Sequence, residues 1–177
     1  DKAAPGVLVV HQWMGLTEYE KGRCKQLAGL GYVAFALDIY GKGIRPSTMQ
    51  DAAKQAGIYK QDRDLYRRRL TLGLEQLRGR QEVAKDQIAA IGYCFGGTGV
   101  LELARSGADI SGVVSFHGGL DSPQPEAGKN ITAKVLICHG ADDPFVPANE
   151  IEAFKSELNS AKVDWEMVIY SGAVHSF

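Results

Sequence analysis

Apolar segments of strand length alternate along this chain with segments of helical periodicity, and this alternation constrains the fold more than any other feature. Several of these segments are apolar at successive positions, as is typical of strands buried on both faces of a sheet. They lie at 6–10, 32–37, 88–91, 110–116, 134–138 and 165–170. Strands that alternate with helices form a parallel sheet with helices on both faces. The sequence therefore predicts an α/β fold, a three-layer α/β/α sandwich with a mostly parallel sheet, and its length favours a single domain over residues 1–177.

The segments between the strands carry apolar residues at helical spacing. The first helix is expected to begin after Thr17, where Glu20 completes a capping-box pattern, and to end at Gly31. Its apolar face would carry Cys24, Leu27, Ala28 and Leu30. Further helices are expected at about 51–57, 61–77, 98–104 and 148–158, with a surface loop at 121–129. In the 61–77 helix, Arg67, Arg68 and Arg69 would form a partly solvated face, and the residues facing the sheet would be Tyr66, Leu70, Gly73, Leu74 and Leu77.

Charge and cysteine content argue against several classes of protein. The net charge of −1 provides no electrostatic footprint for nucleic acid or an anionic membrane, and no apolar run approaches transmembrane length. Neither kind of partner is expected. Three cysteines at wide spacing, Cys24, Cys94 and Cys138, fit neither a disulfide framework nor a zinc motif, which favours a reducing, cytoplasmic location. Because the chain begins at Asp1 without a methionine, an exported, periplasmic protein that has lost a signal peptide remains an alternative.

The turn between the 88–91 strand and the 98–104 helix carries a reactive side chain. It reads Gly92-Tyr93-Cys94-Phe95-Gly96, which matches the G-x-S-x-G nucleophile elbow with a thiol in place of the hydroxyl. A Cβ on either flanking glycine would crowd the neighbouring strand or helix. The N-terminus of the following helix would favour the thiolate. The pattern by itself fits a buried structural cysteine equally well.

Reactive side chains also follow the other strands, whose carboxyl ends share one edge of a parallel sheet. They are His11, Asp38, Cys94, His117, His139, Asp143 and His175. A nucleophile, an acid and a final histidine in the order Cys94, Asp143, His175 is the order of the α/β-hydrolases. His175 would take the thiol proton, and Asp143 would orient the imidazole. Backbone N–H groups of Phe95 and Trp13 would form the oxyanion hole.

Other interpretations of these residues stay open. His117 also ends a strand and could serve as the base in place of His175. No metal or other cofactor is expected, because no pair of the four histidines has the spacing of a metal motif. A different class of function is a non-catalytic or redox-sensing module of the same fold, in which Cys94 is oxidised reversibly.

Five motifs lie in order along nearly the whole chain: HQWMGL at 11–16, LDIYG at 37–41, GYCFGG at 92–97, GADDPFVP at 140–147 and GAVHSF at 172–177. With them the chain resembles the dienelactone hydrolase family of α/β-hydrolases. The resemblance implies the α/β-hydrolase fold and the hydrolysis of a small ester or lactone through an acyl-thioenzyme on Cys94. It also implies that Asp143, and not Asp142, is the acid, that opening strands precede Asp1, and that a closing helix follows Phe177. The small-molecule substrate is the expected partner of a monomer or homodimer.

Two positions depart from that family's pattern. The family often has a glutamate close to the thiol where this chain has Gln12, which cannot carry the charge. Activation of Cys94 would then depend more on His175. Family members that act on dienelactone hold its carboxylate with arginines, and Lys42 stands near one such position as a point charge without the planar fork. This departure weakens the case for dienelactone itself as the substrate.

Overall fold

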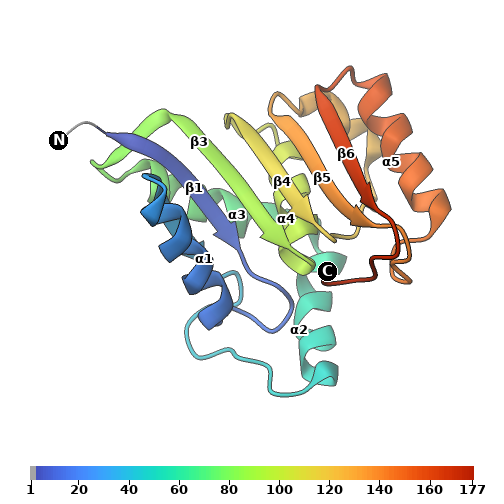
Figure 1. Ribbon diagram of the computed structural model, residues 1–177, viewed down its shortest axis with the longest axis horizontal. Coiled ribbons are helices and arrows are strands. Elements are labelled where there is room, and N and C mark those ends of the chain that lie inside the picture. The colour runs from blue at the N-terminus through green and yellow to red at the C-terminus, as the bar shows by residue number, and fades with distance from the viewer. Residues whose placement is uncertain (1–2) are drawn as a thin grey trace.

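A six-stranded parallel sheet organises the computed structural model, which describes residues 3–177 (Figure 1). The strand order is β2-β1-β3-β4-β5-β6, and every neighbouring pair is parallel. The strands are β1 (Ala4–Val10), β2 (Val33–Leu37), β3 (Val83–Tyr93), β4 (Gly112–Phe116), β5 (Lys134–Gly140) and β6 (Trp165–Tyr170). All six predicted strands are present, so the prediction of an α/β fold with a mostly parallel sheet is confirmed.

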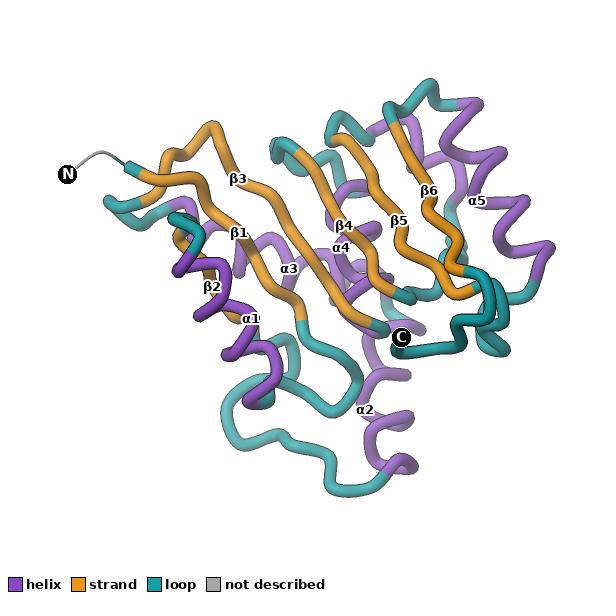
Figure 2. Tube along the Cα trace, in the orientation of Figure 1, coloured by secondary structure: helices purple, strands orange, loops and turns teal. Residues whose placement is uncertain are grey.

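The helices are divided unequally between the two faces of the sheet. They are α1 (Glu18–Gly29), α2 (Met49–Gln61), α3 (Arg63–Arg78), α4 (Phe95–Arg105), the 3₁₀ helix η1 (Pro125–Asn130) and α5 (Ala148–Ser160). Helix α1 packs against β1 and β2 on one face, and α3 and α4 pack behind β1, β3 and β4 on the other (Figures 1 and 2). Helix α5 lies on the same side as α3 and α4, beside η1. None of the helices in residues 3–177 is long and apolar enough to cross a bilayer.

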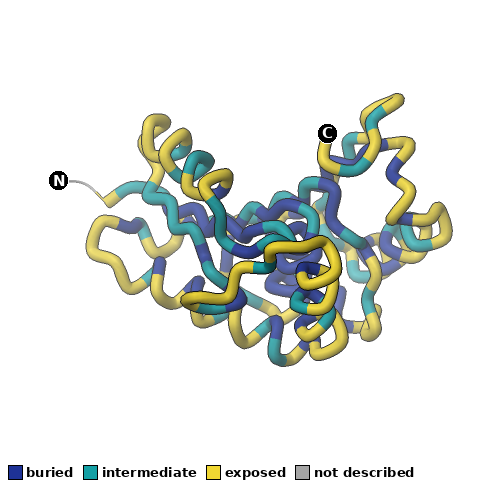
Figure 3. The backbone as a smooth tube through the Cα atoms, turned by 90° about the horizontal axis from the view of Figure 1, so that it is seen from below, coloured by how far each residue is buried: buried dark blue, intermediate teal, exposed yellow. Residues whose placement is uncertain are grey.

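The larger hydrophobic core lies between the sheet and helices α3 and α4. The α3 residues predicted to face the sheet are all buried: Tyr66, Leu70, Gly73, Leu74 and Leu77. A smaller core beneath α1 joins Val7, Val9 and Tyr93 to Cys24 and Leu27. Viewed from below, buried residues gather in the interior of the molecule and exposed residues lie toward its periphery (Figure 3). The apolar residues predicted on the inner face of α3 and along the strands thus contribute to the core.

Helices cover the two faces of the sheet to different extents along the strand order. Within residues 3–177 no helix lies over the α1 side of β4, β5 and β6 (Figure 1). Successive strand residues alternate between faces, so Val114, Leu136 and Val168 point to this side, opposite the buried Val113 and Ile137. All three are only partly buried. Within residues 3–177 the sheet is flanked by helices on both faces, as predicted, and the face on the α1 side is covered at β1 and β2 and open at β4, β5 and β6.

Several local expectations were also wrong. The patch expected at 51–57 is the longer helix α2, because Thr48 caps its N-terminus by accepting from the Asp51 N–H at 3.1 Å. Asp62 ends α2 and caps α3, accepting from the Leu65 N–H at 2.9 Å. Part of the loop expected at 121–129 forms η1. The predicted capping box of α1 is present, but Leu30 follows the helix and is 75% exposed.

Candidate active site

Cys94 occupies the sharp turn between β3 and α4. Its backbone lies in the left-handed region (φ 53°), which is rare for residues other than glycine. Both flanking positions require glycine, because neighbouring backbone atoms leave no room for a Cβ. A Cβ at Gly92 would lie 2.0 Å from the Gly96 carbonyl oxygen, and a Cβ at Gly96 would lie 2.3 Å from the Val10 carbonyl oxygen. The steric reason predicted for the elbow glycines is thus present in the structure.

The thiol, an imidazole and a carboxylate form a continuous hydrogen-bonded series. His175 Nε2 lies 3.2 Å from the Cys94 sulfur, and His175 Nδ1 lies 2.9 Å from Asp143 Oδ2. The other oxygen of Asp143 accepts from the Phe145 N–H at 2.9 Å, so the carboxylate, whose side chain is buried, has a fixed orientation. Residues from the turn after β3, the loop after β5 and the loop after β6 therefore meet in the predicted order.

The two titrating groups of this series shift in opposite directions. Burial alone would raise the pKa of the Cys94 thiol, but hydrogen bonding from the His117 and His175 side chains outweighs it and lowers the pKa to about 6. The hydrogen bond to Cys94 raises the pKa of His175 to about 9, supported by Asp143 and opposed by burial. Between these two values the pair exists as thiolate and imidazolium, which is the reactive form of a cysteine nucleophile.

His117 lies at the end of β4, directly beside the elbow. Like Cys94 it has a left-handed backbone (φ 42°), which its N–H fixes by donating to the Cys138 carbonyl at 2.9 Å. Its ring is buried and meets the His175 ring edge-on at a centroid distance of 4.8 Å. The sulfur of Cys94 and one ring nitrogen of each histidine all lie within 4.8 Å of one another. Two neighbouring strands thus end in strained residues that bring reactive side chains together.

A cavity of about 280 Å³ opens above the thiol. It is lined by Gln12, Trp13, Ala56, Lys60, Cys94, Phe95, Gly119, Phe145, Val146, His175 and Ser176. The predicted neighbours Gln12 and Trp13 are among them. Lys60 is the single lysine or arginine in this lining. It lies beyond 57, the position at which the helix was expected to end, and so was not predicted as a site residue. The signal was the helical spacing of Ala52, Ala56 and Lys60.

The loop after β1 is held rigidly against the elbow. His11 is fully buried, its Nε2 accepts from the Ile39 N–H at 3.1 Å, and its Nδ1 donates to the Gln12 carbonyl at 2.6 Å. Burial lowers the pKa of His11, consistent with the neutral ring that these bonds require. The Trp13 carbonyl accepts from the Tyr40 hydroxyl at 2.9 Å, whereas the Trp13 N–H has no acceptor within residues 3–177. That N–H is available to a ligand in the cavity.

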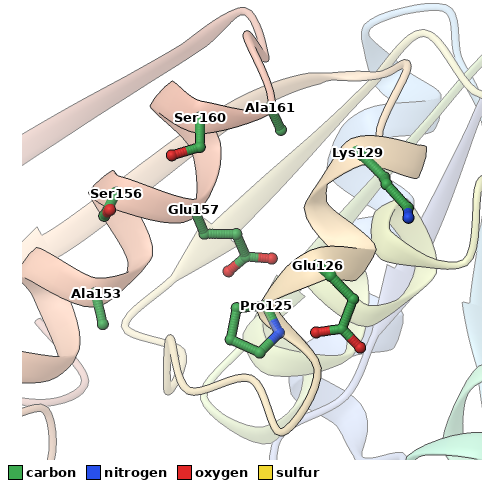
Figure 4. Close-up of a pocket in the computed structure, with 8 residues that line it drawn as sticks. All are labelled: Pro125, Glu126, Lys129, Ala153, Ser156, Glu157, Ser160 and Ala161. Atoms are coloured by element: carbon green, nitrogen blue, oxygen red, sulfur yellow. The ribbon is translucent and has the colours of Figure 1, made fainter.

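A larger surface hollow, of about 500 Å³, lies between η1 and α5 (Figure 4). Its lining residues are Pro125, Glu126, Lys129, Ala153, Ser156, Glu157, Ser160 and Ala161. It contains no cysteine or histidine, and its Glu157 is paired with Arg105. The smaller cavity at Cys94, and not this hollow, therefore holds the groups capable of chemistry.

The sequence matches the dienelactone hydrolase family over residues 1–177. The chain belongs to this family. It is 41% identical to a solved structure called m3DLH, with a TM-score of 0.96 over 100% of this chain and 74% of that chain. It is 38% identical to the dienelactone hydrolase-like promiscuous phosphotriesterase P91 from metagenomic libraries, with a TM-score of 0.94 and the same coverage. A Bradyrhizobium protein named "Probable 2-oxo-3-(5-oxofuran-2-ylidene)propanoate lactonase" is 26% identical over 98% of this chain and 73% of its own length.

Membership of the dienelactone hydrolase family confirms the expected resemblance and the α/β-hydrolase fold. Some strand-end residues of this family member lie away from the cavity. Lys42, which the resemblance placed near the substrate, is exposed and does not line it. Asp38 pairs with Arg45 at 2.8 Å. Asp142 is exposed, as expected for a solvated loop residue, and His139 is buried with its Nδ1 unpaired in the described chain.

Proposed function

We propose that this dienelactone hydrolase-family protein hydrolyses a small ester or lactone through an acyl-thioenzyme on Cys94. The observation that carries the proposal is the series from thiol to His175 to Asp143, at 3.2 and 2.9 Å. The pKa of about 6 for the Cys94 thiol supports a thiolate at neutral pH. The buried Asp143 carboxylate would orient His175 and stabilise its protonated form. His117, which has no carboxylate partner in the described chain, is assigned no role as the base.

Acylation would begin with attack of the Cys94 sulfur on the substrate carbonyl carbon. A carbon–sulfur bond forms, and the carbonyl electrons move to an oxyanion that accepts hydrogen bonds from the N–H groups of Phe95 and Trp13. When the tetrahedral intermediate collapses, the carbon–oxygen bond breaks and protonated His175 transfers its proton to the leaving alkoxide. The product is a thioester on Cys94 and an alcohol, which stays tethered if the substrate is a lactone.

Deacylation would return the groups to their starting states. His175, now neutral, takes a proton from water as the resulting hydroxide adds to the thioester carbonyl. Collapse of the second tetrahedral intermediate breaks the carbon–sulfur bond and releases the acid. The proton taken from water remains on His175, so the thiolate and imidazolium are restored. Gln12 has no charge to offer at any step, which leaves activation of the thiol to His175, His117 and the elbow.

The cavity supports a small substrate, and its charge suggests an anionic one. Lys60 is its single lysine or arginine, and its ammonium group makes no ion pair within residues 3–177. The name of the Bradyrhizobium relative describes a lactone that carries a carboxylate. A lactone or ester with a carboxylate reaching Lys60 would fit both observations. Lys60 would then replace Lys42 as the predicted cation for the substrate.

A short-chain aryl ester assay combined with mass spectrometry tests the reaction. We expect turnover together with a transient acyl adduct on Cys94. Both should disappear in Cys94→Ala and fall strongly in His175→Ala. Cys138→Ala is the matched control, because this buried thiol in β5 does not line the cavity.

Two outcomes would overturn the proposal. Hydrolysis by Cys94→Ala at the parent rate would show that the thiol is not the nucleophile. Absence of turnover on every ester and lactone offered, combined with reversible oxidation of Cys94 by peroxide, would support the redox-sensing alternative.

A further inference from the structure

Three side chains with affinity for transition metals meet at the elbow, and the third, His117, stands outside the hydrogen-bonded series of Cys94, His175 and Asp143. Cys94, His117 and His175 each place one ligand atom within 4.8 Å of the other two. Tetrahedral zinc with Zn–S and Zn–N bonds near 2.3 and 2.1 Å separates its ligand atoms by about 3.5 Å. The Cys94 sulfur and His175 Nε2 are already 3.2 Å apart. Small side-chain rotations would close the remaining difference.

The surroundings of the two histidines suit metal ligands. Asp143 accepts a hydrogen bond from His175 Nδ1 at 2.9 Å, which leaves Nε2 directed at the sulfur. A carboxylate behind a ligating histidine in this way is the common outer shell of zinc sites. His117 is 94% buried, and its Nδ1 has no hydrogen-bond partner in the described chain. The ring is therefore held in place while part of its bonding capacity is unused.

The fourth coordination position would face the open side of the cluster. The cavity lined by Cys94 and His175 lies there and admits water. Three protein ligands and one exchangeable position are the arrangement of an accessible zinc site, whereas a closed structural site has four protein ligands. The ligands come from the ends of β3 and β4 and from the loop after β6, so no short sequence spacing could have revealed them.

We propose that Cys94, His117 and His175 bind a thiophilic divalent cation such as Zn²⁺, and that the bound ion inhibits the protein. The ion would occupy the sulfur lone pair and the His175 nitrogen that the proposed hydrolysis uses. It acts as a reversible blocker and is not a resident cofactor. The inhibitory consequence rests on the proposed function, but the binding site itself does not.

Calorimetric titration with Zn²⁺ in the absence of substrate tests the site. We expect one ion per chain. His117→Asn should weaken binding at least about 10-fold, since losing a ligand should cost no less than losing an outer-shell partner, and Asn tolerates a left-handed backbone. Asp143→Asn, which removes the outer-shell carboxylate, should weaken binding by about 10- to 100-fold. His139→Asn is the matched control, a buried histidine with an unpaired Nδ1 that lies outside the cluster.

Substitution with Co²⁺ identifies the ligands directly. We expect a thiolate-to-metal charge-transfer band that is absent in Cys94→Ala and retained in Cys138→Ala. Zn²⁺ should also inhibit ester hydrolysis, with reversal by EDTA, and His117→Asn should be correspondingly less sensitive relative to its own metal-free rate.

Unchanged Zn²⁺ affinity in folded His117→Asn would overturn the three-ligand site. Persistence of the cobalt band in Cys94→Ala would also overturn it. If the protein proves to have no esterase activity, calorimetry and the cobalt spectrum still decide whether the site exists, so failure of the two proposals can be distinguished.

Discussion

Helix α4 has a cluster of charged side chains at each end, and the clusters differ in how completely their charges are paired. At its N-terminus, Cys94 and His175 form a pair that faces a cavity. At its C-terminus, Arg105 is fully buried and donates to both oxygens of Glu157 at 2.8 and 2.7 Å and to Glu102 at 2.9 Å. Burial opposes the charge on Arg105, but these carboxylates raise its pKa.

The second cluster extends into α3 and closes off the charges from solvent. Arg67, which is half-buried, donates to Glu102 at 2.9 Å, whereas Arg68 and Arg69 are exposed, so the predicted partly solvated face of 67–69 is present and Arg67 forms its inner edge. Here each charge satisfies another charge, and the result is a fixed packing of α3, α4 and α5. At the elbow, the Cys94 sulfur and the His175 imidazole bind each other, and either group can contact a substrate instead. Charges that remain available next to a cavity distinguish the reactive cluster from the structural one.

The largest expected effect is a loss of kcat on disrupting the cluster around Cys94, with little loss of stability. Asp143→Asn should reduce kcat by about 10⁴-fold, because the amide no longer orients His175 or stabilises its protonated form. The free energy of unfolding should change far less. Steady-state kinetics and urea titration measure the two quantities. Asp142→Asn, an exposed neighbour, should match the parent in both.

Disrupting the cluster around Arg105 should instead reduce stability strongly and affect kcat only slightly. Arg105→Met leaves Glu157 without its partner and should lower the free energy of unfolding by about 3–5 kcal/mol, measured by urea titration. In the folded fraction kcat should fall by less than about 10-fold, because Arg105 touches neither thiol nor cavity. The exposed Arg69→Met should change stability by less than about 0.5 kcal/mol. A large loss of kcat with unchanged stability in Arg105→Met would contradict this division of roles.

The pH dependence of kcat/KM should report the ionisation of the Cys94–His175 pair. The pKa of about 6 for Cys94 predicts a rise through pH 6 as the thiol deprotonates. The pKa of about 9 for His175 predicts a fall through pH 9 as the imidazolium is lost. Since His117 helps lower the pKa of Cys94, His117→Asn should move the acidic limb up by about one pH unit. Alkylation rates by iodoacetamide should show the same shift, and an unmoved limb would exclude His117 from thiol activation.

The smallest expected effect concerns substrate charge. Lys60→Met should raise KM for a carboxylate-bearing ester about 2- to 5-fold relative to its neutral analogue, as for an exposed ion pair, and the difference should shrink at high salt. Lys54→Met is the control, since Lys54 is exposed on the same helix but does not line the cavity. Equal effects on the charged and the neutral ester would argue against Lys60 as the substrate cation.

Local patterns in the sequence anticipated what is local in the structure. The capping box at Thr17 and the apolar face of α3 follow from residues three or four positions apart, and both are present. The elbow follows from five consecutive residues. The pairing of Arg67 with Glu102, 35 positions away, depends on how α3 and α4 pack, and no periodicity encodes it. The approach of His117 to Cys94 likewise depends on the register of β3 with β4, in which Tyr93 pairs with Phe116.

The left-handed backbone of Cys94 also limits which nucleophile this turn can carry. At φ 53° a side chain that is unbranched at Cβ is tolerated, whereas a β-branched one meets its own backbone. Serine and cysteine satisfy this condition, and threonine does not, although it has a hydroxyl of similar chemistry. Exchange between oxygen and sulfur at position 94 is therefore open to evolution or design at little conformational cost. The additional methyl group of threonine at position 94 would clash with the main chain, whatever the reactivity of its hydroxyl.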